Sequence, residues 1–300
     1  MTEAGAAKAP SPKSTRRTNI PLGIFYMLAA TVSFAGSTAA AKWLVATYPP
    51  GEVLFMRQVA SLATCALMIL PFTGLTVFHT RRLPAHGVRA VSQATAQTLI
   101  LIALSLLPLA SAVAINFSAP LFATLASAIF LREAVGAVRW AALLIGFFGV
   151  LVITNPGADT FQIGTLYAIG NAVLYGSVTA GVRGMTATES AETLIMYQMV
   201  LLTIIFTAFL PFGFVMPTWI DGAIMLIIGV ANAYGQYWWT RALHLAPASA
   251  VTPFYYFSLV WAIGLGFVIW GDIPTITLLL GSAIVVGSGL FLLWREAGRR

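Results

Sequence analysis

Charged residues are scarce in this sequence. Asp, Glu, Lys and Arg make up 8% of its 300 residues, whereas about 25% is usual in soluble globular domains. So few charged side chains could not cover the surface of a soluble globule of 31.9 kDa. A soluble protein, and with it a soluble enzyme, is therefore excluded. The hydrophobic content of 59% and the mean hydropathy of +0.89 indicate an integral membrane protein.

Cysteine and histidine are also rare, which argues against redox and metal chemistry. Cys65 is the single cysteine, so no intramolecular disulfide or thiolate cluster can form. His79, His86 and His244 are predicted to lie in loops, without the paired spacing of zinc or haem ligands. We therefore expect no metal site and no cofactor.

The net charge of +7 does not indicate a nucleic-acid partner, because the basic residues are scattered among apolar segments. A nucleic-acid-binding face gathers them on one surface. The expected partners are the lipid bilayer and a small-molecule substrate. The oligomeric state is left open, with a monomer as one option.

Apolar segments long enough to cross a bilayer recur along the chain. A membrane-spanning helix needs about 20 mostly apolar residues, and segments rich in Pro, Gly and charge separate the candidates. Residues 1–19 are predicted to form a disordered basic tail, and residues 295–300 a second basic tail. The ten predicted spans are 20–41, 53–72, 91–109, 111–131, 137–153, 163–182, 193–210, 222–240, 248–270 and 274–294.

The distribution of Lys and Arg predicts the orientation of these spans. Basic residues are preferentially retained on the cytoplasmic side. With both termini inside, every Lys and Arg except Lys42 and Arg57 falls on that side. We therefore predict a multi-pass protein of the inner membrane with cytoplasmic N- and C-termini.

The two halves of the chain are related by an internal repeat. A constant shift aligns Pro108 with Pro247, and a shift one residue longer places Gly36 and Ser37 on Gly176 and Ser177. Apolar segments can align through composition alone, but rare prolines and polar residues do so less readily. Five spans per half is an odd number, so the sequence predicts an inverted 5+5 repeat, with domains 20–154 and 163–294.

Several short motifs recur in both halves of the chain. They are Ala103–Ala112, Ala119–Leu121, Leu131–Glu133 and Gly146–Gly149 in the first half, then Ala242–Pro247, Gly271–Asp272 and Gly287–Gly289. These motifs resemble the EamA domain of the drug/metabolite transporter superfamily. The resemblance implies a ten-helix exporter of small metabolites, and it is greatest to bacterial exporters of aromatic amino acids. Asp272, where Glu is usual, and Leu259, where the first copy has Pro120, depart from the pattern.

Neutral polar and aromatic residues at helical spacing within the spans are candidates for a substrate cavity. Their amides and hydroxyls could bind a zwitterion while the rings pack against its side chain, and for any single residue a hydrogen bond between helices is an equal alternative. The candidates are Ser33, Ser37, Gln93, Gln97, Asn116, Tyr167, Asn171, Tyr175, Asn232, Gln236, Tyr255, Tyr256 and Trp261.

A few other residues are candidates for gating or for a charged contact. Gly36 and Gly176 would permit close helix contact, and Pro120 and Pro253 would kink their spans. Arg57 could contact a substrate carboxylate near the outer face, snorkel to the headgroups or pair with Glu52.

The scarcity of Asp, Glu and His within the spans predicts facilitated efflux or exchange without direct proton coupling. The predicted activity is export of neutral or zwitterionic amphipathic metabolites by alternating access, amino acids with aromatic or hydrophobic side chains first. Drugs or other metabolites are the alternative substrates. Phosphorylated solutes are disfavoured, because no Lys or Arg is predicted near the midplane. A channel or a membrane-embedded enzyme ranks lower, since no catalytic set of residues is apparent.

Overall fold

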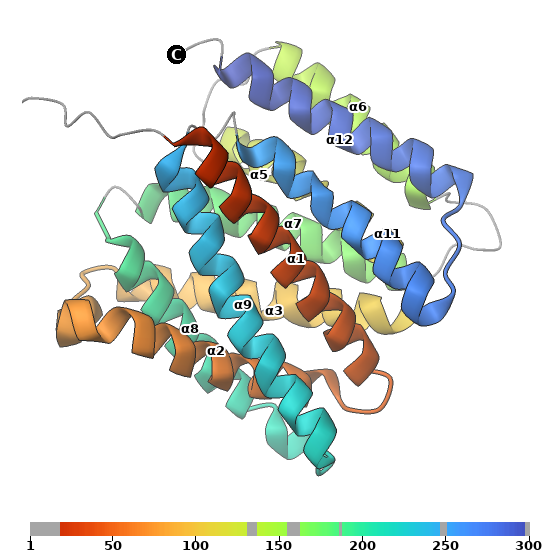
Figure 1. The fold of residues 1–300 in the computed structure, drawn as a ribbon. Coiled ribbons are helices and arrows are strands. Elements are labelled where there is room, and N and C mark those ends of the chain that lie inside the picture. Colours follow the sequence, from red (N-terminus) through yellow and green to blue (C-terminus); the bar gives the residue numbers. More distant parts are fainter. Residues whose placement is uncertain (1–18, 131–136, 155–162, 186–187, 247–250, 298–300) are drawn as a thin grey trace, which may run out of the picture.

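The computed structural model describes residues 19–130, 137–154, 163–185, 188–246 and 251–297, with some side chains inside helices left out. This part of the chain contains helices and loops and no strand, which confirms the all-helical prediction (Figure 1). The longer helices are α1 (Ile20–Leu44), α2 (Pro50–Thr73), α3 (Leu83–Leu106), α6 (Ala137–Thr154), α7 (Ile163–Met185), α8 (Ala191–Thr207), α9 (Trp219–Leu245) and α12 (Ile276–Ala297). The shorter ones are α4 (Leu109–Asn116), α5 (Ala119–Phe130), α11 (Phe257–Trp270), and the 3-10 helices η1 (Gly74–Phe78), η2 (Leu210–Phe212) and η3 (Thr252–Tyr256).

Each predicted span has a helical counterpart, but the boundaries differ in places. Helix α3 begins at Leu83, well before the predicted start at residue 91, with Pro84 in its first turn. Proline suits that position because the N–H group it lacks would be unpaired there anyway. By length and composition alone, three described segments could cross a membrane: Ile20–Leu44, Pro50–Phe78 and Leu83–Leu106. Six further apolar helices have 10–17 residues.

The fourth and ninth predicted spans are interrupted near corresponding positions. Helix α4 ends at Asn116 and α5 starts at Ala119, while η3 gives way to α11 at Phe257. At each break a serine hydroxyl donates to the carbonyl oxygen three residues earlier. Ser118 Oγ lies 2.6 Å from Ile115 O, and Ser258 Oγ lies 2.6 Å from Tyr255 O. The two breaks therefore have the same local chemistry.

Pro120 and Pro253 do not kink continuous helices as predicted. Pro120 stands in the first turn of α5 and Pro253 in the 3-10 helix η3, so neither bends a continuous α-helix. A proline at the start of a helix breaks no intrahelical hydrogen bond. The side chains of Pro120 and Pro253 lie outside the described residues.

Helices from the two halves pack against each other in matched pairs. Helix α1 contacts α9 and α11, and its counterpart α7 contacts α3 and α5. Likewise α2 contacts α9 where α8 contacts α3. Helices α6 and α12 contact each other and form a pair at one side of the bundle (Figure 1). Exchanging the two halves thus reproduces the main helix contacts.

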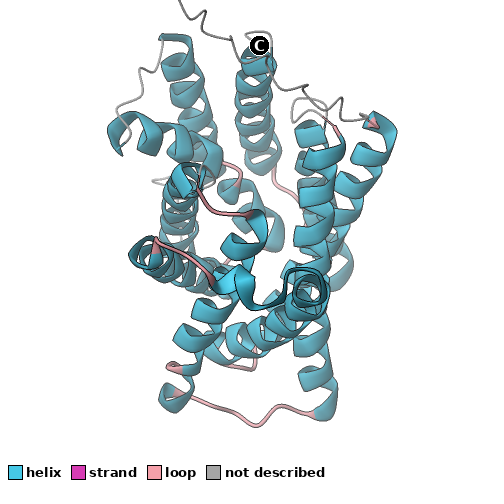
Figure 2. Ribbon diagram, turned by 90° about the vertical axis from the view of Figure 1, so that its left-hand side faces the viewer, coloured by secondary structure: helices cyan, strands magenta, loops and turns pink. Residues whose placement is uncertain are grey.

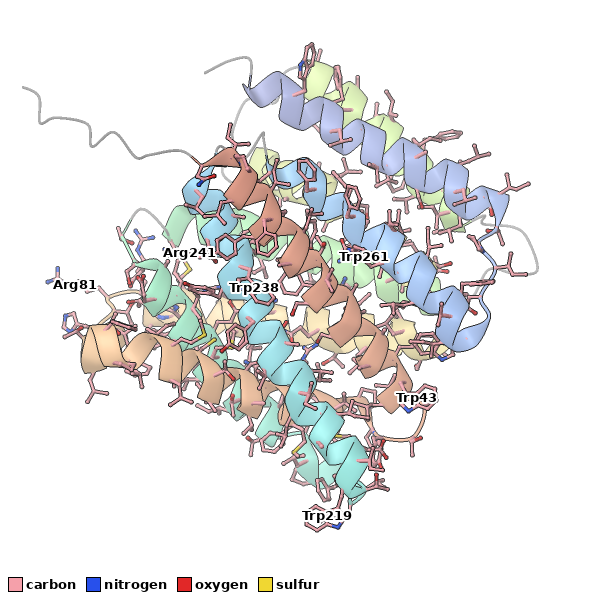
Figure 3. All side chains as sticks on the ribbon, viewed as in Figure 1. Trp43, Arg81, Trp219, Trp238, Arg241 and Trp261 are labelled. Atoms are coloured by element: carbon pink, nitrogen blue, oxygen red, sulfur yellow. The ribbon has the colours of Figure 1, made fainter. Side chains whose placement is uncertain are left out.

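Large apolar side chains cover the outside of the bundle. Phe72 is 88% exposed and Trp219 is 95% exposed, which suits a surface that faces lipid. Trp43 and Trp219 lie toward one end, and Arg81 and Arg241 lie toward the other (Figure 3). The described loops join the helices at their ends (Figure 2). The largest buried apolar cluster, which includes Leu54, Leu104 and Phe206, combines helices from both halves.

Candidate functional site

Three aromatic rings meet where the two broken spans approach each other. The ring of Phe117, in the first break, lies 5.9 Å from the ring of Tyr255 and 5.1 Å from that of Tyr256, both in η3. Tyr255 and Tyr256 are candidates from the sequence, whereas Phe117 is not. Its place beside Asn116, which aligns with Tyr255 across the repeat, is the signal that could have identified it.

A pair of asparagines joins the first break to α7. Asn171 Nδ2 donates to Asn116 Oδ1 at 2.7 Å, and Asn171 is buried. Tyr167, Asn171 and Tyr175 share one face of α7, as their spacing predicts. Tyr175 is 40% exposed, and its hydroxyl lies near enough to Tyr255 and Arg89 for an electrostatic interaction. The structure thus brings Asn116, Asn171, Tyr175 and Tyr255 into one region.

The polar candidates on α1 and on the first part of α9 bond to neighbouring helices instead. Ser33 Oγ donates to Ala231 O at 2.6 Å, and Ser37 Oγ donates to Ile228 O at 3.2 Å. Asn232 Nδ2 donates to Ser61 Oγ of α2 at 3.4 Å. For these residues the structure favours the alternative of hydrogen bonds between helices.

Two further candidates lie at the edge of this arrangement. Trp261 Nε1 donates to Thr31 Oγ1 at 3.2 Å, which ties α11 to α1. Thr31 is not among the candidates from the sequence, although it aligns with Asn171 across the repeat. Gln236 is partly buried on α9.

Arg57 points into the bundle and bonds to a neutral partner. Its Nη2 donates to Gln97 Oε1 of α3, which joins two candidates from the sequence. The alternative of a pair with Glu52 does not hold in this structure, because Glu52 Oε2 accepts from Val215 N at 2.9 Å. The other oxygen of the fully buried Glu52 is unpartnered among the described atoms.

Arg89 was missed as an interior residue because α3 starts earlier than predicted. Its Nη1 donates to Leu194 O at 3.0 Å, and its Nη2 donates to Gln198 Oε1 of α8. The sequence would have placed Arg89 inside the third span if Pro84 had been taken as the start of that helix.

Several minor predictions are corrected at the helix ends. His86 and His244 lie in helices α3 and α9 and not in loops, and the His86 ring stacks on Tyr197 at 4.4 Å. At the start of α12, Thr275 Oγ1 accepts from Leu278 N, and Asp272 lies four residues before the helix. Glu133, the corresponding residue of the first half, lies outside the described residues.

Lys42, in the last turn of α1, bonds to the end of a neighbouring helix. Its Nζ donates to Leu104 O at 2.8 Å and to Leu107 O at 2.5 Å. Both carbonyls belong to the C-terminal end of α3, where a cation is favourable. Lys42 therefore ties the end of α1 to the end of α3.

Gly176 and Gly36, the two predicted hinge glycines, have different surroundings. A Cβ atom at Gly176 would lie 2.5 Å from Ala119 O and 2.7 Å from Ala123 N of α5. A Cβ atom at Gly36 would meet no atom within 4 Å. Of these two glycines, only Gly176 packs so closely against its neighbour that a side chain would not fit.

The apolar exterior and the polar interior together define the class of this protein. It is a multi-helix membrane protein whose interior carries amides, tyrosines and guanidinium groups. In the part of the chain that the structure describes, no group of His, Cys, Asp and Glu could hold a metal ion. The profile of the EamA-like transporter family matches residues 21–155 and again residues 162–294. The chain belongs to this family of membrane transporters.

Curated relatives of the chain are transporters of several different solutes. A riboflavin transporter of Rhizobium johnstonii is 30% identical over 284 residues, with 93% of each chain covered. An S-adenosylmethionine uptake transporter of Rickettsia bellii is 24% identical and covers 92% of this chain and 94% of its own. A pseudopaline exporter of Pseudomonas aeruginosa is 24% identical and covers 88% of this chain and 93% of its own.

The fold is shared with a solved crystal structure. The TM-score is 0.64 at 20% sequence identity, and the match covers 92% of this chain and 99% of the other. At this identity the similarity concerns the fold alone.

Proposed function

We propose that the protein is a secondary transporter of the inner membrane that moves a small organic solute with an aromatic ring by alternating access. Its termini are cytoplasmic, and its two five-helix halves are an inverted repeat. The matched helix contacts and the two family matches support the repeat. Transport is facilitative or by exchange and runs down the solute gradient.

The aromatic cluster beside the asparagine pair is the observation that carries this proposal. Phe117, Tyr255 and Tyr256 bring three aromatic rings together at the helix breaks, and the paired amides of Asn116 and Asn171 lie next to them. Interrupted helices supply polar backbone groups in the middle of a transporter, where substrates commonly bind. A planar ring that also carries hydrogen-bonding groups fits this combination.

Two kinds of solute fit the proposal. Aromatic amino acids are the candidates from the sequence, and their zwitterionic group suits the amides. A flavin is the second candidate, because the riboflavin transporter of Rhizobium johnstonii is 30% identical to this chain. Drugs remain an alternative class, and a channel or a membrane-embedded enzyme ranks below them.

Counterflow in proteoliposomes tests this function. Vesicles are preloaded with unlabelled phenylalanine, tryptophan or riboflavin, and the entry of the labelled solute is followed. We expect accelerated, saturable entry for at least one of the three. Entry that does not saturate would indicate a channel, and the absence of exchange for all three in folded protein would contradict the proposal.

A matched pair of variants locates the site. Phe117→Ala removes a ring from the cluster, and Phe148→Ala removes an exposed ring from α6, at the side of the bundle. We expect Phe117→Ala to slow counterflow by about tenfold, which corresponds to about 1.4 kcal/mol, and Phe148→Ala to leave it unchanged. Equal effects would exclude the cluster as the binding site.

A further inference from the structure

Two arginine side chains lie inside the bundle and bond to glutamines. Arg57 of α2 donates to Gln97, and Arg89 of α3 donates to Gln198 and to the carbonyl of Leu194. The Nε atom of each arginine is buried and has no hydrogen-bond partner among the described atoms. Each guanidinium group thus keeps an unused donor.

Neither guanidinium group has an acidic partner within the described residues. Arg57 bonds to a neutral amide, and Arg89 bonds to a neutral amide and a carbonyl and interacts electrostatically with the Tyr175 hydroxyl. An amide or a carbonyl satisfies a hydrogen bond but leaves the positive charge uncompensated. Unpaired cations inside a membrane protein are costly and commonly mark a pathway for a ligand or an ion.

Helix α3 connects the two arginines through one polar face. Arg89, Gln93 and Gln97 follow each other at intervals of four residues, so their side chains share a face of the helix. At 1.5 Å per residue, Arg89 lies about 12 Å along the axis from Gln97, the partner of Arg57. Gln93 stands between them, is 8% exposed and has no bonded side-chain partner among the described residues.

We propose that the transported solute carries an oxyanion, a carboxylate or a phosphate, that binds Arg57 and Arg89 at the two ends of this face. The proposal rests on the transport function argued above and narrows its substrate class. An oxyanion accepts from several N–H groups of a guanidinium at once, so it supplies both the missing charge and a partner for the unused donors. Gln93 offers a neutral intermediate contact for the passage of the anion from one arginine to the other.

An interfacial arginine would have a different environment. A snorkelling side chain extends its charged group to the headgroups and makes few contacts inside the protein. Arg241 resembles this case, because it is exposed and its guanidinium lies over the Tyr237 ring at 5.8 Å. Arg57 and Arg89 instead join neighbouring helices through their terminal nitrogens. Arg241 therefore serves as the control residue.

Protection from phenylglyoxal, a reagent that modifies arginine, tests the proposal on the wild-type protein in proteoliposomes. Peptide mass spectrometry follows Arg57, Arg89 and Arg241 with benzoate, phenyl phosphate or the neutral benzyl alcohol present. At an oxyanion concentration of about ten times its Kd, we expect about tenfold slower modification of Arg57 and Arg89. Benzyl alcohol should not protect them, and Arg241 should be unaffected by all three compounds. Benzoate and phenyl phosphate distinguish a carboxylate from a phosphate.

Three outcomes would overturn the proposal. The first is modification of Arg57 and Arg89 as fast with the oxyanions as without them, and the second is equal protection by benzyl alcohol. The third is the absence of modification at both residues while Arg241 reacts. In the last case neither residue is reachable from water, and no dissolved anion could bind it.

A transport assay separates this proposal from the function on which it rests. Counterflow is compared for phenylalanine and for phenylalaninamide, which lacks the carboxylate. We expect a preference of about tenfold for the carboxylate, equivalent to about 1.4 kcal/mol. The preference should be lost in Arg57→Gln and Arg89→Gln and kept in Arg57→Lys and in Arg241→Gln. Saturable counterflow without any preference would retain the transporter and overturn the oxyanion site.

Discussion

The two halves of the molecule make matched helix contacts, but these contacts are not equally close. In the second half, Gly176 of α7 lies directly against the backbone of α5, at the start of the helix that follows the first break. In the first half, the corresponding Gly36 of α1 faces open space, although α1 also contacts α11. Under the proposed alternating access, we expect a closed contact on one side and an open one on the other in any one state, since the halves exchange roles between states.

The polar contacts differ in the same way. Asn171 bonds to Asn116 at 2.7 Å, a short contact between α7 and α4. At the corresponding place in the first half, Thr31 accepts from Trp261 at 3.2 Å. The tighter glycine contact and the shorter hydrogen bond both belong to α7. Under the proposed alternating access, the α7–α5 contact therefore belongs to the closed side in this structure and the α1–α11 contact to the open side.

The largest expected effect comes from adding one methyl group to each hinge glycine. Gly176→Ala places a Cβ atom against the α5 backbone and should destabilise the protein by about 1–3 kcal/mol, the usual cost of overpacking. Gly36→Ala meets no neighbour and should stabilise it by up to about 1 kcal/mol, because alanine is the better helix former. Thermal unfolding in detergent measures both variants. Equal shifts in the two would contradict the asymmetry.

The same Gly36→Ala variant should slow transport while the fold is kept. If α1 closes onto α11 in the opposite state, as α7 closes onto α5 here, the added methyl group obstructs that state. We expect a loss of about tenfold in counterflow, equivalent to about 1.4 kcal/mol. Gly264→Ala, on α11 and also without a neighbour near its Cβ position, is the control and should transport normally. Normal transport in Gly36→Ala would show that α1 does not close onto α11 at Gly36 during transport.

The polar contacts should show a smaller asymmetry. A double-mutant cycle of Asn116→Ala and Asn171→Ala should give a coupling near the average for membrane helices, about 0.6 kcal/mol, and no more than about 1.7 kcal/mol. The cycle of Thr31→Val and Trp261→Phe should give less, because its hydrogen bond is longer. Unfolding by denaturant in mixed micelles measures both cycles. A larger coupling for Thr31 and Trp261 would reverse the assignment of the closed side.

The smallest effects are expected at the helix breaks, where the two halves are alike. Ser118→Ala and Ser258→Ala each remove one hydrogen bond from a serine hydroxyl to a nearby carbonyl. Ile115 O also accepts from the backbone N–H of Ser118, so it is not left unpaired. Each variant should cost about 0.5 kcal/mol, at the low end for a hydrogen bond. Unequal melting temperatures would show that the breaks are not equivalent.

Much of the fold could be predicted from hydropathy, because each predicted span corresponds to a helix or to a broken pair of helices. The breaks themselves could not, since Asn116 and Ser118 are isolated polar residues in an otherwise apolar span and hydropathy does not distinguish a continuous helix from two short ones. The error at the start of α3 had a larger consequence. This error placed Arg89 outside the predicted spans, so the second interior cation was not recognised.

The site was predicted only in part. The spacing of Tyr167, Asn171 and Tyr175 placed them on one face, and the repeat indicated Asn116 and Tyr255 as a matched pair. Ser33 and Ser37 follow the same spacing, yet they bond to the backbone of α9. Periodicity gives the face of a helix but not the neighbour that this face meets, so it could not separate these two roles.

The sequence by itself determined the membrane class, the helical spans and the relation between the halves, because composition and periodicity express the energy of transfer into lipid. Only the tertiary structure decided which polar groups meet. Arg57 bonds to Gln97 and not to Glu52, which is five residues before it in the sequence, since helices α2 and α3 bring Arg57 and Gln97 together across the bundle. The same holds for the difference between Gly36 and Gly176, which depends on how closely each helix approaches its neighbour.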